Sequence, residues 1–161
     1  MTEQAASEKV VIKDADGNVT EEAAMQNGML EGETVLYAKG RVQARLQFHE
    51  GKQHGEAVFL DEAGEIKVKS KYEAGTLQGE SLYYGDAGKV IRKAAYSKGE
   101  LHGWVIDYYP NGKAREISRY AEGVLNGQVI RYDKDGNATE RLCFEKGKQR
   151  PCPQAAAPKK K

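Results

Sequence analysis

Glycine recurs along this 161-residue chain with a period of about 24 residues. One register of six glycines runs from Gly28 to Gly147, with a first interval of 23 residues and later intervals of 24. A second register, from Gly17 to Gly136, precedes the first by 11 residues in every copy. Three residues before each glycine of the first register stands a large side chain: Met25, Phe48, Tyr72, Tyr96, Tyr120 or Phe144. Such a period indicates an array of repeats in which each unit packs on its neighbours.

The predicted unit is a β-hairpin, because two glycine-bearing turns per period leave segments of about eight residues, too short for helices and normal for strands. Tyr109-Pro110-Asn111-Gly112 suits a type I turn followed by a residue of positive φ. The other turn has the form Gly-x-Leu-x-Gly, as in residues 75–79. We therefore expect an all-β fold: an elongated, single-layer antiparallel sheet of tandem hairpins with about ten to twelve strands. Residues 1–9 are predicted to be a flexible N-terminus, 10–152 the array, and 153–161 a flexible basic tail.

The composition argues against a bulky globular core, because 39% of the residues are hydrophobic and 30% are charged. No stretch approaches the roughly 18 consecutive apolar residues of a membrane span, and residues 1–9 lack the apolar centre of a signal peptide. Residues 1–33 hold eight acidic and two basic residues, whereas residues 34–161 hold 16 acidic and 23 basic residues. The array is thus modestly basic, which favours an acidic partner but falls below the density typical of nucleic-acid-binding proteins.

Strand alternation predicts one packed face and one basic face. We expect Val58, Leu82 and Ile106 to share the packed face with Val68, Ala94 and Tyr96. Charges at Arg92 and Glu116 also fall on that face, either as an ion pair or because the face is half buried. The opposite face is predicted to be basic and ribbed with aromatic side chains, and its interleaved acids favour a protein partner over a polyanion. The residues expected to bind the partner are Phe59, Lys67, Lys69, Tyr83, Lys93, Tyr109, Arg115, Arg119 and Arg131. A solvated face whose lysines and arginines oppose aggregation is the alternative interpretation.

The segment Tyr96-Ser97-Lys98-Gly99-Glu100-Leu101-His102-Gly103, followed by Tyr108-Tyr109-Pro110-Asn111-Gly112-Lys113, resembles the MORN repeat in its bacterial variant form. The resemblance extends over roughly residues 10–151. It implies a hairpin-repeat sheet similar to bacterial antitoxin and immunity proteins of toxin–antitoxin systems, which bind a cognate toxin or effector protein.

Candidate catalytic and metal-binding residues have a simpler explanation in the repeat. His54 and His102 occupy the same turn position two units apart, which places them roughly 19 Å apart on a sheet, whereas zinc ligands lie within about 2.1 Å of one ion. Glu56 and Glu80 are likewise equivalent positions of successive units. No phosphate-binding glycine motif and no nucleophile–base spacing occurs. We therefore expect neither an enzyme nor a cofactor or metal site.

The two cysteines flank the last predicted turn. Cys143 precedes Gly147 by four residues and Cys152 follows it by five, so a hairpin there would set them opposite each other. We expect a disulfide and hence a periplasmic or otherwise extracytoplasmic location, with two reduced thiols in a cytoplasmic protein as the alternative. The leading functional hypothesis is a monomeric antitoxin or immunity protein that blocks its toxin without catalysis. The second is a cell-envelope or membrane-surface module that binds anionic lipid or glycan.

Overall fold

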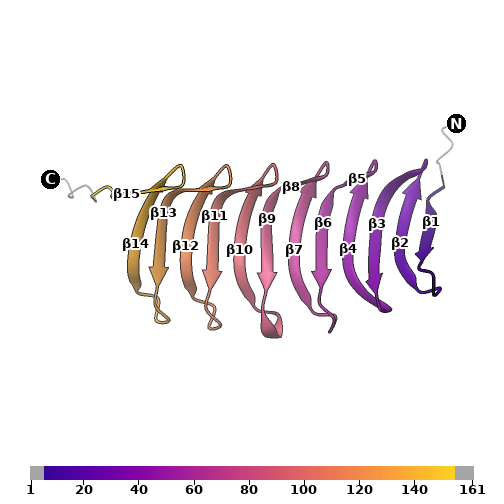
Figure 1. The fold of residues 1–161 in the computed structure, drawn as a ribbon, viewed down its shortest axis with the longest axis horizontal. Helices are drawn as coiled ribbons and strands as arrows, with labels where there is room; N and C mark the ends of the chain where they lie inside the picture. Colours follow the sequence, from indigo (N-terminus) through magenta and orange to yellow (C-terminus); the bar gives the residue numbers. More distant parts are fainter. Residues whose placement is uncertain (1–5, 155–161) are drawn as a thin grey trace.

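The computed structural model describes residues 6–154 of the chain. Over these residues the chain forms one open sheet in which each strand lies antiparallel to its neighbours, and the first and last strands lie at opposite ends of the sheet (Figure 1). The main path follows the order β1-β2-β3-β4-β6-β7-β9-β10-β11-β12-β13-β14-β15, while β5 pairs with β4 and β8 with β7. The strands are β1 (Glu8–Lys13), β2 (Val19–Gln26), β3 (Met29–Ala38), β4 (Arg41–His49), β5 (Lys52–Gln53), β6 (Gly55–Leu60), β7 (Ile66–Glu73), β8 (Thr76–Leu77), β9 (Gly79–Tyr84), β10 (Val90–Ser97), β11 (Glu100–Tyr108), β12 (Ala114–Ala121), β13 (Val124–Tyr132), β14 (Ala138–Glu145) and β15 (Lys148–Arg150). A 3₁₀ turn, η1 (Asp86–Gly88), connects β9 to β10.

The predicted all-β, single-layer hairpin array is confirmed, and the described part of the chain has more strands than expected, namely 15. One reason is that β1 begins at Glu8 and completes a hairpin with β2, so the first unit is whole. The second reason is that segments after the glycine turns form short separate strands, such as β5 and β8. The predicted flexible N-terminus therefore includes the start of a strand. Residues 1–5 of that segment, and 155–161 of the predicted basic tail, lie outside the described residues.

The glycines of the first register end two-residue turns in which both residues have positive φ. Lys98 and Gly99 have φ values of 52° and 83°, and the flanking residues Ser97 and Glu100 pair across the hairpin. This is the pattern of a type I′ turn, whose twist matches the right-handed twist of the strands. The turn therefore consists of the first glycine of the predicted Gly-x-Leu-x-Gly segment and the residue before it. The residues after that glycine begin the following strand, as Glu100 begins β11. In each case the leucine or its replacement lies opposite the large side chain of the period, as Leu101 does opposite Tyr96.

These turns are linked from one repeat to the next by backbone hydrogen bonds. The Gly99 N–H donates to the Leu77 carbonyl at 2.9 Å, and the Gly123 N–H donates to the Leu101 carbonyl at 3.0 Å. Gly51, Gly75 and Gly147 make the same bond to the preceding repeat. Each turn is consequently held by the turn before it, so the repeats form a continuous row along one edge of the sheet, the upper edge in Figure 1.

Turns at the opposite edge depend on an acidic side chain in three of the repeats. The Asp61 carboxylate accepts hydrogen bonds from the N–H groups of Ala63 and Glu65 at 2.9 and 3.0 Å, while Gly64 takes a φ of 83°. Asp14 and Asp133 form the same arrangement. The bond from the Glu65 N–H is the main reason that the pKa of Asp61 lies below its usual value, because donors stabilise the ionised carboxylate.

A one-residue β-bulge interrupts the returning strand of every repeat. In the hairpin of β11 and β12, Tyr108 pairs with Ala114 but Asp107 pairs with Glu116, so Arg115 is the extra residue. The equivalent extra residues elsewhere are Thr20, Gln43, Lys67, Ile91 and Thr139. Because side chains alternate with a period of two, such a bulge changes which residues of the two strands share a face.

The core is a row of small side chains that runs along the middle of one face. Ala57 and Ser81 are fully buried, and Ala94 and Ser118 are almost so. The Ser70 and Ser81 hydroxyls hydrogen-bond each other at 2.8 Å, which satisfies two polar groups in this row. Larger side chains on either side of the row, such as Tyr83 and Tyr96, can close over residues of this size. The sheet therefore buries a core without a second layer.

Replacement of Gly103 by alanine is expected to lower the free energy of unfolding by about 2–4 kcal/mol. Gly103 has a φ of 109°, and an added Cβ would lie 3.1 Å from the Cβ of Ala95. The control is Gly17→Ala, which has a φ of 85° but meets no atom within 4 Å. Urea denaturation followed by far-ultraviolet circular dichroism measures both, and an equal loss in the two variants would contradict a contribution from the contact with Ala95.

Candidate functional site

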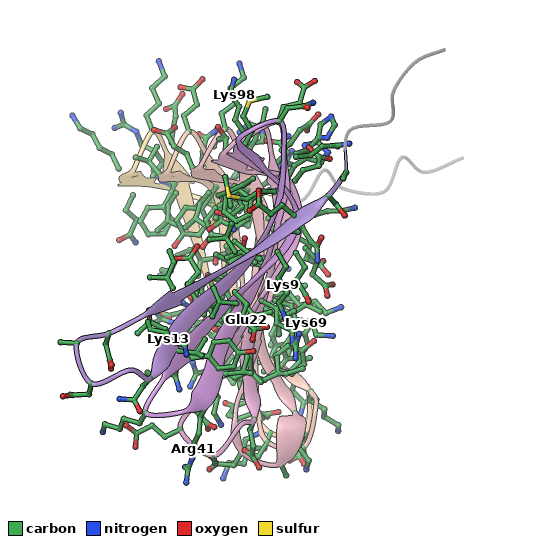
Figure 2. All side chains as sticks on the ribbon, turned by 90° about the vertical axis from the view of Figure 1, so that its right-hand side faces the viewer. Lys9, Lys13, Glu22, Arg41, Lys69 and Lys98 are labelled. Carbon is green, nitrogen blue, oxygen red and sulfur yellow. A yellow bond between two sulfur atoms is a disulfide. The ribbon has the colours of Figure 1, made fainter. Side chains whose placement is uncertain are left out.

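The strand register divides the side chains into two faces that differ in chemistry. We call one the aromatic face; its central row passes through Phe59, Val68, Tyr83, Arg92, Asp107, Glu116, Arg131 and Glu140. We call the other the basic face; its central row passes through Val58, Lys69, Leu82, Lys93, Ile106, Ile117, Ile130 and Arg141. Figure 2, an end-on view, shows Lys69 on the same side of the sheet as Lys9 and Glu22.

The nine residues predicted to bind a partner do not share one face. The basic face holds Lys69, Lys93 and Arg119, the aromatic face holds Phe59, Tyr83 and Arg131, the bulges hold Lys67 and Arg115, and Tyr109 begins a turn. The predicted packed face is wrong for the same reason: Val58 lies opposite Lys69, not Val68. The prediction assumed uninterrupted alternation around each hairpin, and the bulge reverses the faces of all residues beyond it.

Charged groups on the aromatic face are paired with one another. The Arg92 guanidinium donates two hydrogen bonds to the Asp107 carboxylate, at 2.6 and 2.8 Å, and Asp107 is only 8% exposed. Arg131 bonds Glu116 at 2.8 Å and Glu140 at 2.6 Å. The expected ion pair between Arg92 and Glu116 is therefore wrong, because the strand between them supplies the partner of Arg92. This face offers few unpaired charges to a ligand.

The basic face carries cations that have no ion-pair partner among the described residues. Glu73, Glu100 and Glu145 lie on this face at the strand ends beside the glycine turns. Between those ends, from β6 to β14, it presents five basic residues and two acidic ones: Lys69, Lys71, Lys93, Arg119 and Arg141 against Glu56 and Glu80. None of these seven takes part in a salt bridge within residues 6–154. The Arg119 guanidinium lies 5.4 Å from the ring of Trp104, which is 50% exposed. Unpaired cations beside exposed apolar groups make this face the candidate functional site.

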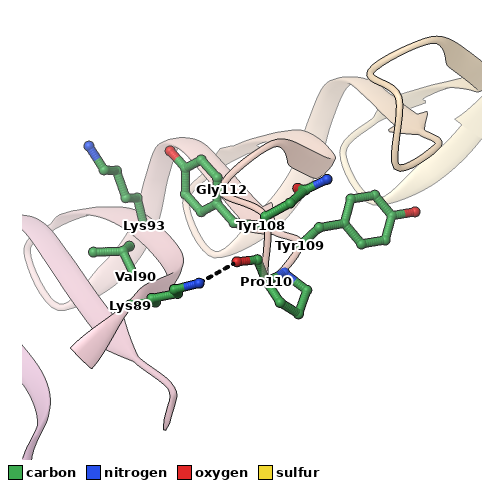
Figure 3. Close-up of a pocket in the computed structure, with 8 residues that line it drawn as sticks. Lys89, Val90, Lys93, Tyr108, Tyr109, Pro110 and Gly112 are labelled. Atoms are coloured by element: carbon green, nitrogen blue, oxygen red, sulfur yellow. Dashed lines mark hydrogen bonds between the residues drawn. The ribbon is translucent and has the colours of Figure 1, made fainter. Parts of the chain in front are cut away.

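A pocket of about 400 Å³ opens where the basic face meets the turn between β11 and β12 (Figure 3). Val90 and Lys93 of β10 form one wall, and Tyr108 and Pro110 form the other. The ammonium of Lys89 donates to the Pro110 carbonyl at 3.1 Å and joins the two walls. Tyr109, one of the predicted residues, also lines the pocket and donates its hydroxyl to the Tyr132 carbonyl at 2.8 Å. The bulge at Ile91 places Val90 on the same face as Lys93, which uninterrupted alternation along the sequence does not predict.

Two tyrosine hydroxyls meet on the aromatic face. The Tyr83 and Tyr96 oxygens are 3.0 Å apart. Burial raises the pKa of Tyr83 to about 12, and the hydrogen bond with Tyr96 contributes to the same shift. Neutral Tyr83 is therefore favoured in the folded protein.

His54 belongs to a structural series at the glycine turns, whereas the His49 Nδ1 lies 2.9 Å from the Glu31 carboxylate. The His54 Nδ1 accepts a hydrogen bond from the Ala74 N–H at 3.3 Å. Glu31, Gln78 and Asn126 occupy the equivalent position in other repeats and accept from Glu50, Lys98 and Lys146, respectively. In these four repeats the position supplies a hydrogen-bond acceptor to the next turn. The described residues contain no group of three or more histidine, cysteine, aspartate or glutamate side chains placed to hold a metal ion.

The predicted disulfide between Cys143 and Cys152 is present, with the two Cα atoms 5.0 Å apart. Cys143 lies in β14, and Cys152 follows the end of β15. The bond therefore ties the last segment of the described chain to the final hairpin.

Comparison with known proteins does not assign a family. No protein-family model matches the chain, and no curated protein matches it. Among solved structures, a GtfA/B complex bound to UDP and GlcNAc is similar over 68% of this chain and 22% of its own, at 12% identity and a TM-score of 0.34. The chain thus spans about a fifth of that structure's length, and a TM-score of this size supports no inference. Within residues 6–154 there is no helix with the length and apolarity needed to cross a membrane.

Replacement of Tyr83 by phenylalanine should remove a tyrosine that ionises near pH 12. Because its folded pKa lies above the ordinary value of 10, its contribution to stability is complete below about pH 10 and is lost as the pH rises toward 12. Alkaline titration of tyrosine absorbance measures this ionisation as a step in absorbance near pH 12. Tyr84→Phe is the matched control, and persistence of the full step in Tyr83→Phe would show that Tyr83 is not its source.

Proposed function

We propose that this protein is a non-catalytic binding protein that holds a protein partner on its basic face. The observation that carries the proposal is the composition of the central row of that face. Lys69 and Lys93, which have no ion-pair partner in the part of the chain that the structure describes, alternate there with the half-buried side chains of Leu82 and Ile106. A surface of this kind complements a partner that combines acidic and apolar groups.

Several features of the basic face favour a protein over a uniform polyanion. Glu56 and Glu80 lie on the same face and would repel closely spaced phosphates. Toward β14 the central row continues with two apolar side chains, Ile117 and Ile130, which offer no positive charge to a polyanion. Protein interfaces typically join an apolar centre to a polar rim, and tyrosine, tryptophan and arginine often supply their strongest contacts. Trp104 and Arg119 on this face are of those types.

The particular class that we propose is a bacterial antitoxin or immunity protein that neutralises its toxin or effector by direct binding. The resemblance of residues 96–113 to the bacterial form of the MORN repeat supports this class. A sheet whose turns are joined by hydrogen bonds from one repeat to the next can present a rigid face, which lowers the entropic cost of binding.

The first partner to test is the product of the gene that neighbours the one encoding this chain. In the double variant Lys69→Glu/Lys93→Glu, the complex should weaken by about 100-fold, because two charges on the interface are reversed. Titration calorimetry at low and high salt measures the change. Lys148→Glu, which makes the same change on β15, should leave affinity within about twofold.

Each outcome bears on a different part of the proposal. The absence of any complex with the neighbouring product contradicts the assignment as its antitoxin. A complex that persists in the double variant, with unchanged circular dichroism, contradicts the basic face as the interface. If the wild type instead binds anionic vesicles, and the double variant does not, the membrane-surface function replaces the antitoxin function.

The disulfide supports a location outside the cytoplasm, because disulfides persist in oxidising compartments. In protein recovered from its native cells under conditions that block thiol exchange, we expect Cys143 and Cys152 to resist maleimide labelling until a reductant is added. Mass spectrometry counts the labels. Labelling of both thiols before reduction would indicate a reducing compartment.

A further inference from the structure

The pocket at the edge of the basic face occurs twice, one repeat apart. The first pocket, of about 310 Å³, is lined by Ile66, Lys69 and Tyr84. The second, of about 400 Å³, is lined by Val90, Lys93 and Tyr108. Each residue of the second set follows its counterpart in the first by 24 residues, which is the period of the array. The repetition shows that the pocket is a feature of the repeat and not an accident of one loop.

Both pockets combine the groups that hold a carboxylate attached to an apolar segment. An aliphatic side chain and a tyrosine ring form apolar walls, and a lysine without an ion-pair partner among residues 6–154 supplies a positive charge. The two differ at the residue before the aliphatic side chain, where the second pocket has Lys89 and the first has Glu65, which accepts a hydrogen bond from Lys67 at 3.4 Å. The second pocket should therefore attract an anion more strongly.

The pattern ends at the next repeat. There Ala114 and Tyr132 occupy the places of Val90 and Tyr108, but Ile117 occupies the place of the lysine. A lysine beside an aliphatic side chain and a tyrosine thus occurs in these two repeats, whereas the preceding repeat has Val42, Arg45 and Leu60 there, and Arg45 donates to Glu33 at 3.2 Å. Lys69 lies on β7 and Lys93 on β10, two strands further along the sheet, so equivalent points of the two pockets are about 10 Å apart.

We propose that the two pockets form a paired site for an extended polypeptide segment of another protein that carries an acidic side chain at every third residue. In the polyproline II conformation, residues i and i+3 lie on the same side of the chain and are separated by about 9 Å, which matches the pocket spacing. Segments of this conformation commonly bind grooves lined by aromatic side chains. This inference rests on the proposed function, since it names the part of the partner that the basic face holds.

The test uses fluorescein-labelled peptides and the full chain. The probe is (Ala-Pro-Glu)₅, and two controls are (Ala-Pro-Gln)₅ and a peptide of identical composition whose five glutamates are consecutive. Fluorescence anisotropy should show the spaced acidic peptide binding about tenfold more tightly than either control. Equal affinity for the spaced and consecutive glutamates would overturn the proposal, because it would indicate only general attraction between opposite charges.

Substitutions assign the binding to the pockets. Lys93→Glu should weaken binding of the spaced peptide by about tenfold and Lys69→Glu by less, whereas Lys148→Glu should have little effect. Ile117→Lys should create a third cationic pocket and strengthen binding of a peptide lengthened by one Ala-Pro-Glu unit. Unchanged binding in Lys93→Glu would overturn the site, and so would an equal loss in Lys148→Glu.

Failure of this inference can be separated from failure of the proposed function. If Lys69→Glu/Lys93→Glu abolishes the complex with the protein partner while no peptide binds, the basic face is supported as the interface and the paired carboxylate site is contradicted. If the peptides bind as expected while the double variant leaves the partner complex unchanged, the paired site is supported and the proposed interface is contradicted.

Discussion

The whole sheet depends on a backbone constraint at one edge, where two successive residues of each turn must take positive φ. Lys98–Gly99 and Glu122–Gly123 meet it with a residue near 50° followed by a glycine near 80°. The tight turn brings consecutive strands together with the correct twist, and the glycine N–H then bonds the preceding turn. Each hairpin is therefore oriented by its neighbour. A chain with few large apolar residues can form a stable sheet in this way, because it adds small contacts repeat by repeat instead of filling one central core.

The bulge in each returning strand decides what the two faces contain. It sets Arg92 opposite Tyr83 and Asp107, so that charges on the aromatic face find partners within the sheet. It also sets Lys93 opposite Leu82 and Ile106, which cannot neutralise it. The two faces therefore differ in charge pairing even though the overall charge of the chain is close to neutral: Arg92 and Arg131 have partners on the aromatic face, whereas Lys69 and Lys93 on the basic face have no ion-pair partner among residues 6–154.

Repetition also explains why residues that suggest chemistry are structural. His54, Gln78 and Asn126 share only the ability to accept a hydrogen bond, which is what the next turn requires at that position. Asp61 and Asp133 share the ability to bind two backbone N–H groups of their own turn. Side chains that depart from the repeat are more informative about function. Ile117 is such a departure, because the equivalent positions of other repeats hold the basic residues Arg45, Lys69, Lys93 and Arg141.

The sequence by itself determined the repeat, the hairpin unit, the single-layer sheet and the cysteine pair, because each depends on local features: turn glycines, segment length and spacing along the chain. It also determined which residues occupy equivalent positions. Only the tertiary structure decided which residues share a face and which form a pocket. A single extra residue at Lys67, Ile91 or Arg115 reverses the alternation beyond it, and an amino-acid pattern with a period of two is equally consistent with either pairing. The hydrogen-bond register between paired strands selects one of these two assignments of residues to faces.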